Sequence, residues 1–192
     1  MIISLTGFMG CGKSSVGRRL SELLCCPFMD LDDVIVESAG RSIPEIFATE
    51  GEAGFRRMEL ETLKEIISTS EPRQCAPIEN LDCHPEASSC HPERSEGSIN
   101  LVLALGGGTV MTPECAEIVK EQTCCIYLRA SIDTLERHLS GEADGRPMLK
   151  GDGLRERITE LMAQRSETYE KTAHIIIDID GRSIDSIASE II

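Results

Sequence analysis

The sequence predicts a three-layer α/β/α domain built around a central parallel sheet of five strands. Short apolar runs alternate along the chain with segments of helical periodicity, which is the pattern of repeated units of strand and helix. A glycine-rich loop joins the first apolar run to the first helical segment. The connections after the strands are short, so the helices must cross over the sheet and cover it. With 192 residues, 41% of them hydrophobic, the chain is expected to form a single domain over 1–192.

The N-terminal stretch carries the clearest motif. An apolar run at 2–6 enters Gly7-Phe8-Met9-Gly10-Cys11-Gly12-Lys13-Ser14, which has the spacing G-x-x-x-x-G-K-S, and a helical pattern from Lys13 to about Leu24 follows. The glycines let the backbone curl with its N–H groups inward, and the helix adds its positive dipole end. Lys13 is expected to reach the β- and γ-phosphates of a nucleotide, and the Ser14 hydroxyl to contact Mg²⁺. A chance glycine-rich turn would not explain why strand, motif and helix occur together.

A short second strand leads into clustered carboxylates at Phe28-Met29-Asp30-Leu31-Asp32-Asp33. The carboxyl ends of parallel strands face the ligand, so Asp30 and Asp32 are expected beside the phosphate loop. Alternate residues of an extended run point the same way, which would let both carboxylates face one cleft. The alternative interpretation is an acidic helix start with Asp as its cap.

Two capping boxes predict the next two helices. Ser42 with Glu45 and Thr49 with Glu52 both match S/T-x-x-E, and the second box opens a longer helix. An apolar stripe along that helix comprises Phe55, Met58, Leu63, Ile66 and Ile67. We expect a substrate-binding subdomain over about 32–66, standing over the phosphate loop.

The segment from about 70 to 99 interrupts the pattern. It is rich in Pro, Ser and Glu and nearly free of apolar residues, a composition that predicts a disordered insertion. Cys-His-Pro-Glu occurs at 83–86 and again at 90–93. Two Cys and two His suggest zinc, but each Cys directly precedes its His, unlike familiar zinc spacings. The tandem repeat also resembles translated interspersed repeat elements, which would give it no catalytic role.

The fold is expected to resume at 101–105, a strand that ends in Gly106-Gly107-Gly108 and brings backbone N–H groups close to a ligand. Thr112-Pro113 is typical of a helix start. A strand at 125–128 and a helix over about 132–139 follow.

A glycine-rich, charged loop at about 140–153 is typical of a lid. Its Arg146 would swing onto the phosphates on closure, although an ordinary solvent loop with a structural Arg would look similar. Asp152 is expected to cap a long helix, roughly 154–171, that carries Arg165. A strand at 174–179 and a helix capped by Ser183 end the pattern. His138 and His174 lack a paired acid and nucleophile, and both are interpreted as structural.

Composition limits the function classes. A net charge of −14, from 33 acidic and 19 basic residues, argues against a nucleic-acid-binding surface, so placed cations must attract any anionic ligand. No apolar run has membrane-spanning length, and Met1 runs directly into the first strand, so a cytoplasmic location with nine reduced cysteines is expected. Cys11 lies at a helix N-terminus inside the phosphate loop, where its oxidation or alkylation should block nucleotide.

Three segments together go beyond a generic phosphate-loop protein: Asp30-Leu31-Asp32, the stretch from Gly40-Arg41-Ser42-Ile43-Pro44-Glu45-Ile46-Phe47 on to Gly51-Glu52-Ala53-Gly54-Phe55-Arg56-Arg57-Met58-Glu59, and Leu105-Gly106-Gly107-Gly108. With these motifs the chain resembles the shikimate kinases, P-loop kinases of small metabolites with a fold like that of nucleoside-monophosphate kinases. The resemblance covers the chain outside 70–99.

The resemblance implies transfer of the ATP γ-phosphate to the 3-hydroxyl of shikimate, in chorismate and aromatic amino-acid biosynthesis, by a monomer with one Mg²⁺ ion. Asp32 would contact the ring hydroxyls and accept the proton, with Lys13 and the lid arginine Arg146 as further catalytic residues. Ser14 would hold the metal directly and Asp30 through water. The implied shikimate-binding residues are Asp32, Arg56, Gly107, Gly108 and Arg165. The implied ATP-binding residues are Gly10, Cys11, Gly12, Lys13, Ser14, Ser15, Arg146 and Arg182, with Arg137 a candidate for the adenine.

Two other functions compete with this interpretation. A related small-metabolite kinase, such as a gluconate kinase, would share the phosphate loop but lack the Phe-Arg-Arg and triple-glycine motifs. A nucleotide-binding regulatory module damaged by its insertion would bind ATP without shikimate-dependent turnover.

Overall fold

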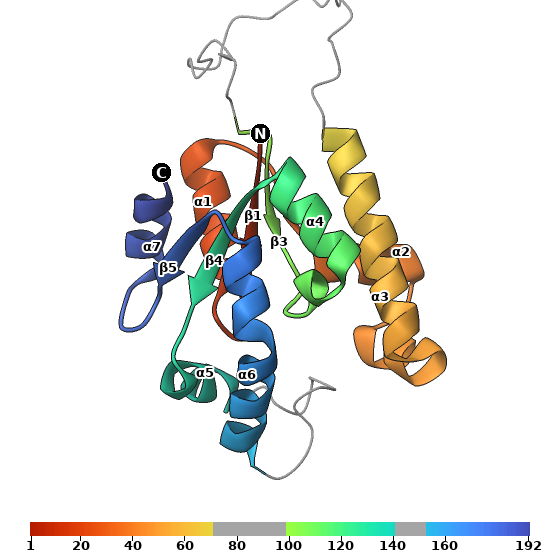
Figure 1. Cartoon of the computed structure of the whole chain (residues 1–192). Helices are drawn as coiled ribbons and strands as arrows, with labels where there is room; N and C mark the ends of the chain where they lie inside the picture. Colours follow the sequence, from red (N-terminus) through yellow and green to blue (C-terminus); the bar gives the residue numbers. More distant parts are fainter. Residues whose placement is uncertain (71–98, 141–152) are drawn as a thin grey trace, which may run out of the picture.

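The computed structural model describes residues 1–70, 99–140 and 153–192 (Figure 1). In this part of the chain five parallel strands form one sheet, as predicted, and their order in the sheet is β2-β3-β1-β4-β5. The strands are β1 (Ile2–Thr6), β2 (Phe28–Asp30), β3 (Leu101–Ala104), β4 (Cys124–Arg129) and β5 (Ile175–Asp178). The expected insertion, apart from its ends, and most of the expected lid, with Arg146 and Asp152, lie outside the described residues.

Helices cover both faces of the sheet, which gives the predicted three layers (Figure 1). They are α1 (Lys13–Leu24), α2 (Leu31–Ala39), α3 (Ile43–Ser70), α4 (Pro113–Gln122), α5 (Ile132–Leu139), α6 (Leu154–Thr172) and α7 (Ile184–Ile191), with a 3₁₀ turn η1 at Thr109–Met111. Side chains of a strand alternate between faces. Accordingly Leu5 of β1 packs with α1 and α7, whereas Tyr127 of β4 packs with α3, α4 and α6 on the opposite face.

The two helices predicted in this part of the chain are both present: α3 consists of two helical segments that meet at a kink at Gly51. Gly51 has φ 69° and ψ −175°, a conformation that glycine adopts without strain. The first capping box forms, because the Ser42 N–H and hydroxyl both donate to Glu45 Oε2, at 2.8 and 2.6 Å. The second box does not form: the Thr49 hydroxyl donates to the Glu45 carbonyl oxygen at 2.9 Å, one turn back in the first of the two segments.

α6 begins at Leu154, as predicted. Its N-cap position is Gly153, which has φ 88° and no side chain to cap the helix, and the predicted cap, Asp152, lies outside the described residues. Ser183 does cap α7 as predicted, by accepting a hydrogen bond from the Ser186 N–H at 3.2 Å. None of the described helices combines the length and the apolar character needed to cross a membrane.

The core on the α1 face offers a test of the fold. Leu20→Ala is expected to lower the free energy of unfolding by about 2–5 kcal/mol, because Leu20 is fully buried between α1 and the sheet. Leu23→Ala is the matched control on the same helix, since Leu23 is 40% exposed and its truncation should cost less than about 1 kcal/mol. Urea unfolding followed by circular dichroism measures both, and equal losses would contradict this packing.

Candidate functional site

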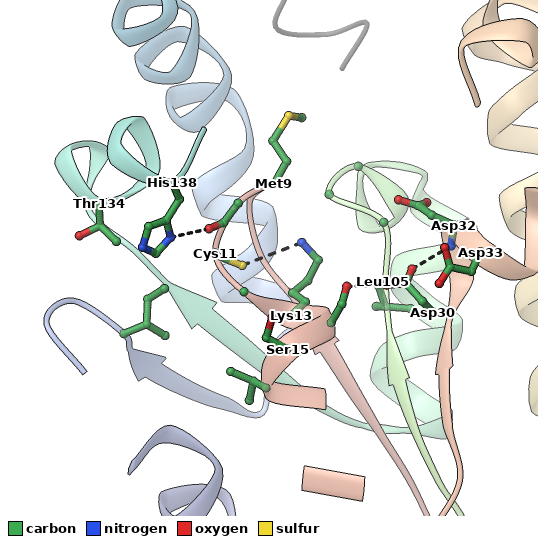
Figure 2. A pocket seen from close by; sticks show the side chains of 18 of the residues that line it. Met9, Cys11, Lys13, Ser15, Asp30, Asp32, Asp33, Leu105, Thr134 and His138 are labelled. Carbon is green, nitrogen blue, oxygen red and sulfur yellow. Dashed lines mark hydrogen bonds between the residues drawn. The ribbon is translucent and has the colours of Figure 1, made fainter. Parts of the chain in front are cut away.

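A large cavity of about 1470 Å³ opens at the carboxyl ends of the strands, between the phosphate loop, α2, α5 and α6 (Figure 2). Every predicted site residue that the structure describes lines it. These residues are Gly10, Cys11, Gly12, Lys13, Ser14, Ser15, Asp30, Asp32, Arg56, Gly107, Gly108, Arg165 and Arg182, together with the adenine candidate Arg137. Arg146 lies outside the described residues. The topology therefore brings the N-terminal motif together with residues far along the chain.

The phosphate loop is curled as the sequence predicts. Gly10 and Gly12 have φ values of 81° and 86°, and α1 begins at Lys13. The buried Lys13 ammonium lies against the loop, where it donates to the carbonyl oxygens of Gly7 and Phe8 at 3.0 and 3.1 Å. A cation is thus fixed beside a row of backbone N–H groups, which is the arrangement that binds polyphosphate.

Cys11, whose oxidation or alkylation is predicted to block nucleotide, is buried in the phosphate loop. Its side chain is 1% exposed and belongs to the core that contains Phe8, with Sγ 3.9 Å from Lys13 Nζ (Figure 2). Burial keeps oxidants and alkylating reagents away from the thiol while the loop holds this shape, so ready modification of Cys11 is not supported.

Asp30 connects the phosphate loop to α2. Its Oδ2 accepts a hydrogen bond from the Ser14 hydroxyl at 2.5 Å. Its Oδ1 accepts from the Asp32 N–H at 3.1 Å (Figure 2). Asp30 is therefore the N-cap of α2, as the alternative interpretation expected, and it also lines the cavity beside the phosphate loop. The expectation that Asp30 and Asp32 alternate on one strand is wrong, because β2 ends at Asp30 and Asp32 reaches the cavity from the first turn of α2.

Asp32 is the most perturbed carboxyl group of the described cavity. Its Oδ1 is buried and has no hydrogen-bond partner among the described residues. Burial, with the neighbouring carboxylates of Asp30 and Glu59, raises the pKa of Asp32 to about 6, while the Lys13 ammonium opposes the shift. A carboxylate whose pKa lies near neutrality and whose oxygen lacks a donor is suited to accept a proton from a ligand hydroxyl.

Arg56 is held by two carboxylates of its own helix. Its Nη1 lies 2.5 Å from Glu59 Oε2, and its Nη2 lies 3.2 Å from Glu52 Oε1. Glu59 is fully buried, and its other oxygen accepts a hydrogen bond from the Thr109 hydroxyl at 2.8 Å. In the sequence, Glu59 is only part of a motif, and no role in the site is predicted for it. Its position three residues after Arg56, on the same helix face, was the available signal.

The glycines after β3 are required by the side chains that surround them. A Cβ atom on Gly106 would lie 2.7 Å from Asp32 Oδ1, and one on Gly108 would lie 2.7 Å from Arg56 Nη1. The sequence predicts glycine here so that a ligand can approach the backbone. The structure adds that any larger residue at these two positions would displace the charged groups of the cavity.

The opposite wall of the cavity comes from α6. Arg165 is 6% exposed, and its Nη1 donates to the Gly107 carbonyl oxygen at 3.2 Å. The Tyr169 hydroxyl, one turn further along α6, donates to the same oxygen. Arg56 and Arg165 thus approach the glycine segment from two different helices, as expected for two guanidinium groups facing one small anion.

Two further residues of the cavity lining, Arg182 and His138, make contacts that the sequence did not predict. The Arg182 guanidinium faces α7, where it donates to the Ser186 carbonyl oxygen at 3.2 Å and pairs with Glu190 at 2.5 Å. His138, interpreted from sequence as structural, lines the cavity, and its Nδ1 lies 2.8 Å from the Gly10 carbonyl oxygen (Figure 2). A carbonyl oxygen can only accept, so Nδ1 carries the hydrogen.

Comparison with known proteins gives one family. The family model described as shikimate kinase matches residues 9–73 and 90–192. A shikimate kinase of Dictyoglomus turgidum is 35% identical over 192 residues, a match that covers 99% of this chain and 94% of the relative. A shikimate kinase of Thermus thermophilus is 35% identical over 190 residues, with 99% and 87% covered.

Solved structures agree with the sequence matches. A shikimate kinase from Acinetobacter baumannii, solved in complex with shikimate, is similar with a TM-score of 0.80 and 29% identity, and the match covers 99% of this chain and 89% of that one. A shikimate kinase from Aquifex aeolicus has a TM-score of 0.71 and 27% identity, with 100% and 93% covered.

The buried carboxyl group predicts a pH-dependent stability. The pKa of Asp32 in the folded chain, about 6, exceeds its ordinary value of 3.8, so the native state binds more protons between these values. Stability from this group is therefore present at low pH and lost as the pH rises through that window. Asp32→Asn is expected to raise the free energy of unfolding at about pH 8 by about 1–2 kcal/mol, and by less near pH 4.

Urea unfolding at these two pH values measures the effect. Asp33→Asn is the control, because Asp33 is exposed in the same helix turn, where its charge favours the helix N-terminus. That variant should be slightly less stable than the native chain at about pH 8. An Asp32→Asn protein less stable than the native chain at this pH would contradict the electrostatics described above.

Proposed function

The chain belongs to the shikimate kinase family, and we propose how its residues divide the work of the family's reaction. The enzyme transfers the γ-phosphoryl group of ATP to the 3-hydroxyl group of shikimate and gives 3-phosphoshikimate and ADP, a step in the biosynthesis of chorismate and the aromatic amino acids. One observation carries the assignment of residues: the same cavity joins the phosphate loop to a buried carboxylate and two guanidinium groups. The gluconate kinase alternative is excluded by the family membership.

The phosphate loop binds the polyphosphate of ATP. Lys13 neutralises the β- and γ-phosphates, while backbone N–H groups from Gly10 to Ser15 surround them. Arg146 is proposed as a further catalytic cation from sequence alone, since it lies outside the described residues. Arg137 of α5 and Arg182, just before α7, both line the cavity and are proposed to contact the nucleoside.

Shikimate binds where the glycine segment, Arg56 and Arg165 meet. Both guanidinium groups are fixed before the ligand arrives, Arg56 by Glu59 and Arg165 by the Gly107 carbonyl oxygen. A small carboxylic acid can pair with both of them. Its ring hydroxyls then lie toward Asp32, whose free Oδ1 accepts the proton of the attacking hydroxyl. We propose that α2 and the N-terminal part of α3, over about 32–66, form the substrate-binding subdomain.

The donor set beside the loop fits a magnesium ion. The Ser14 hydroxyl and the Asp30 carboxylate lie 2.5 Å apart, and oxygen donors of this kind, few in number and close to phosphates, are what Mg²⁺ prefers. We propose that Ser14 holds one ion directly and Asp30 holds it through water. When bound, the ion supplies positive charge that neutralises the phosphoryl group in transfer. Asp30 keeps its second oxygen on α2, which holds the carboxylate in place.

We also propose an oligomeric state and a cellular location for the enzyme. The described residues complete the shikimate end of the cavity within one chain, which supports a monomer, and light scattering after gel filtration tests this. The six described cysteines are free, which agrees with a reducing compartment such as the cytoplasm.

Loss of the Asp32 carboxylate is expected to abolish turnover and spare nucleotide binding. Asp32→Asn keeps the shape of the side chain but removes the proton acceptor, so shikimate-dependent ADP release should fall by about 10²–10⁴-fold. A coupled assay measures ADP release, and calorimetry measures ATP binding. Near-native turnover would exclude Asp32 as the base. Native protein that binds ATP but ignores shikimate would instead indicate the regulatory module.

Loss of the Arg165 guanidinium is expected to weaken shikimate more than ATP. Arg165→Ala removes a buried charge that faces the substrate, so the KM for shikimate should rise by about tenfold or more, with the KM for ATP within about twofold. Lys171→Ala is the control, because it removes an exposed cation of the same helix. Equal changes in both KM values would show that the variant disturbs the whole cavity and would contradict the assignment.

A further inference from the structure

We propose that Tyr169 is a positioning residue for the shikimate end of the site, and that it acts by holding the Gly107 carbonyl group. The inference rests on the proposed function, because it assumes that the glycine segment and the two arginines receive the substrate. Tyr169 touches neither the reacting atoms nor the open cavity. Its effect must therefore pass through the groups it contacts.

A hydrogen bond joins Tyr169 to the glycine segment. Tyr169 is fully buried, and its hydroxyl donates to the Gly107 carbonyl oxygen. Burial raises the pKa of the Tyr169 hydroxyl far above its ordinary value, so the group stays a donor throughout the working pH range. The ring is fixed from the side by Tyr127, whose centroid lies 5.1 Å away with the planes 29° apart. Little rotational freedom is left to the donor.

This hydrogen bond fixes the orientation of the peptide unit between Gly107 and Gly108. Gly107 and Gly108 carry no side chains, so packing of a Cβ atom cannot fix the orientation of the peptide unit between them. Two donors from one face of α6, the Arg165 guanidinium and the Tyr169 hydroxyl, hold its carbonyl oxygen instead. The hydroxyl is buried and pre-oriented by the ring stack, whereas the Arg165 bond is 3.2 Å long. Tyr169 is thus the more rigid of the two restraints.

The direction of the Gly108 N–H follows from peptide geometry. The described part of the chain contains no cis peptide bond, so the Gly108 N–H points opposite to the Gly107 carbonyl group. Because the carbonyl group faces α6, that N–H is directed away from α6. Gly108 lines the cavity against the Arg56 guanidinium, and Gly107 lies against the backbone of Met9 in the phosphate loop. The Tyr169 hydroxyl thereby sets the direction of a backbone donor beside Arg56.

The hydrogen bond also affects Arg165. Its guanidinium shares the Gly107 oxygen with Tyr169, so a carbonyl group held in place also fixes the position of one Arg165 nitrogen. Without the hydroxyl, the glycine segment and Arg165 would reorient together and the substrate would have to order them on binding. The free energy needed for this ordering would lower the affinity for shikimate and leave the affinity for ATP unchanged.

The test is Tyr169→Phe, which keeps the ring and its stack on Tyr127 and removes one oxygen atom. The KM and the calorimetric dissociation constant for shikimate are expected to rise about five- to tenfold, the usual worth of one net hydrogen bond. The KM for ATP should stay within about twofold, and thermal unfolding should show a folded protein. Tyr127→Phe is the matched control, since it removes the hydroxyl of the stacking partner and should leave both KM values near native.

Three results would overturn the proposal. Native shikimate affinity in Tyr169→Phe would show that the hydroxyl restrains nothing of use to the substrate. Equal losses for shikimate and ATP would show a general disturbance. Equal losses in Tyr127→Phe and Tyr169→Phe would show that removing either buried hydroxyl disturbs the site, so that the bond to Gly107 has no special role. Failure of the proposed function itself would look different, because native protein would then show no shikimate-dependent turnover.

Discussion

The site depends on the carboxylate of Asp30, which joins two helices that start at different strands. One oxygen accepts from Ser14 in the first turn of α1, and the other accepts from the backbone at the start of α2. The phosphate loop and the segment that carries Asp32 are thereby fixed relative to each other. In the proposed reaction, the phosphate loop faces a phosphate and Asp32 faces a hydroxyl group. The Asp30 side chain therefore fixes the distance between the groups that bind the two ligands.

The chain concentrates opposite charges in one cavity despite its overall acidity. Asp32 lies among carboxylates that destabilise its ionised form, and Glu59 is buried completely beneath Arg56. Burying these two carboxyl groups lowers the free energy of unfolding. The apolar cores on the two faces of the sheet offset this loss. The benefit is a set of groups that need no rearrangement when the substrates bind.

Sequence reasoning predicted the sheet, the phosphate loop and the residues of the cavity well, because each depends on local signals. Gly10 and Gly12 indicate the loop, and apolar runs indicate the strands. It failed where a contact is made across the fold. The route of Asp32 into the cavity depends on where β2 ends, the role of Glu59 depends on Thr109, which lies far along the chain, and the contact of His138 depends on a carbonyl group of the loop.

Cys11 has a consequence for how the phosphate loop can be observed. Its thiol is sealed inside the core as long as the loop keeps its curl around Lys13. A reagent can reach the sulfur only when the loop opens locally. The rate at which the thiol is modified therefore depends on the frequency of this opening. The rate of Cys11 modification therefore reports how often the loop opens, and it should fall when a bound polyphosphate holds the loop backbone in place.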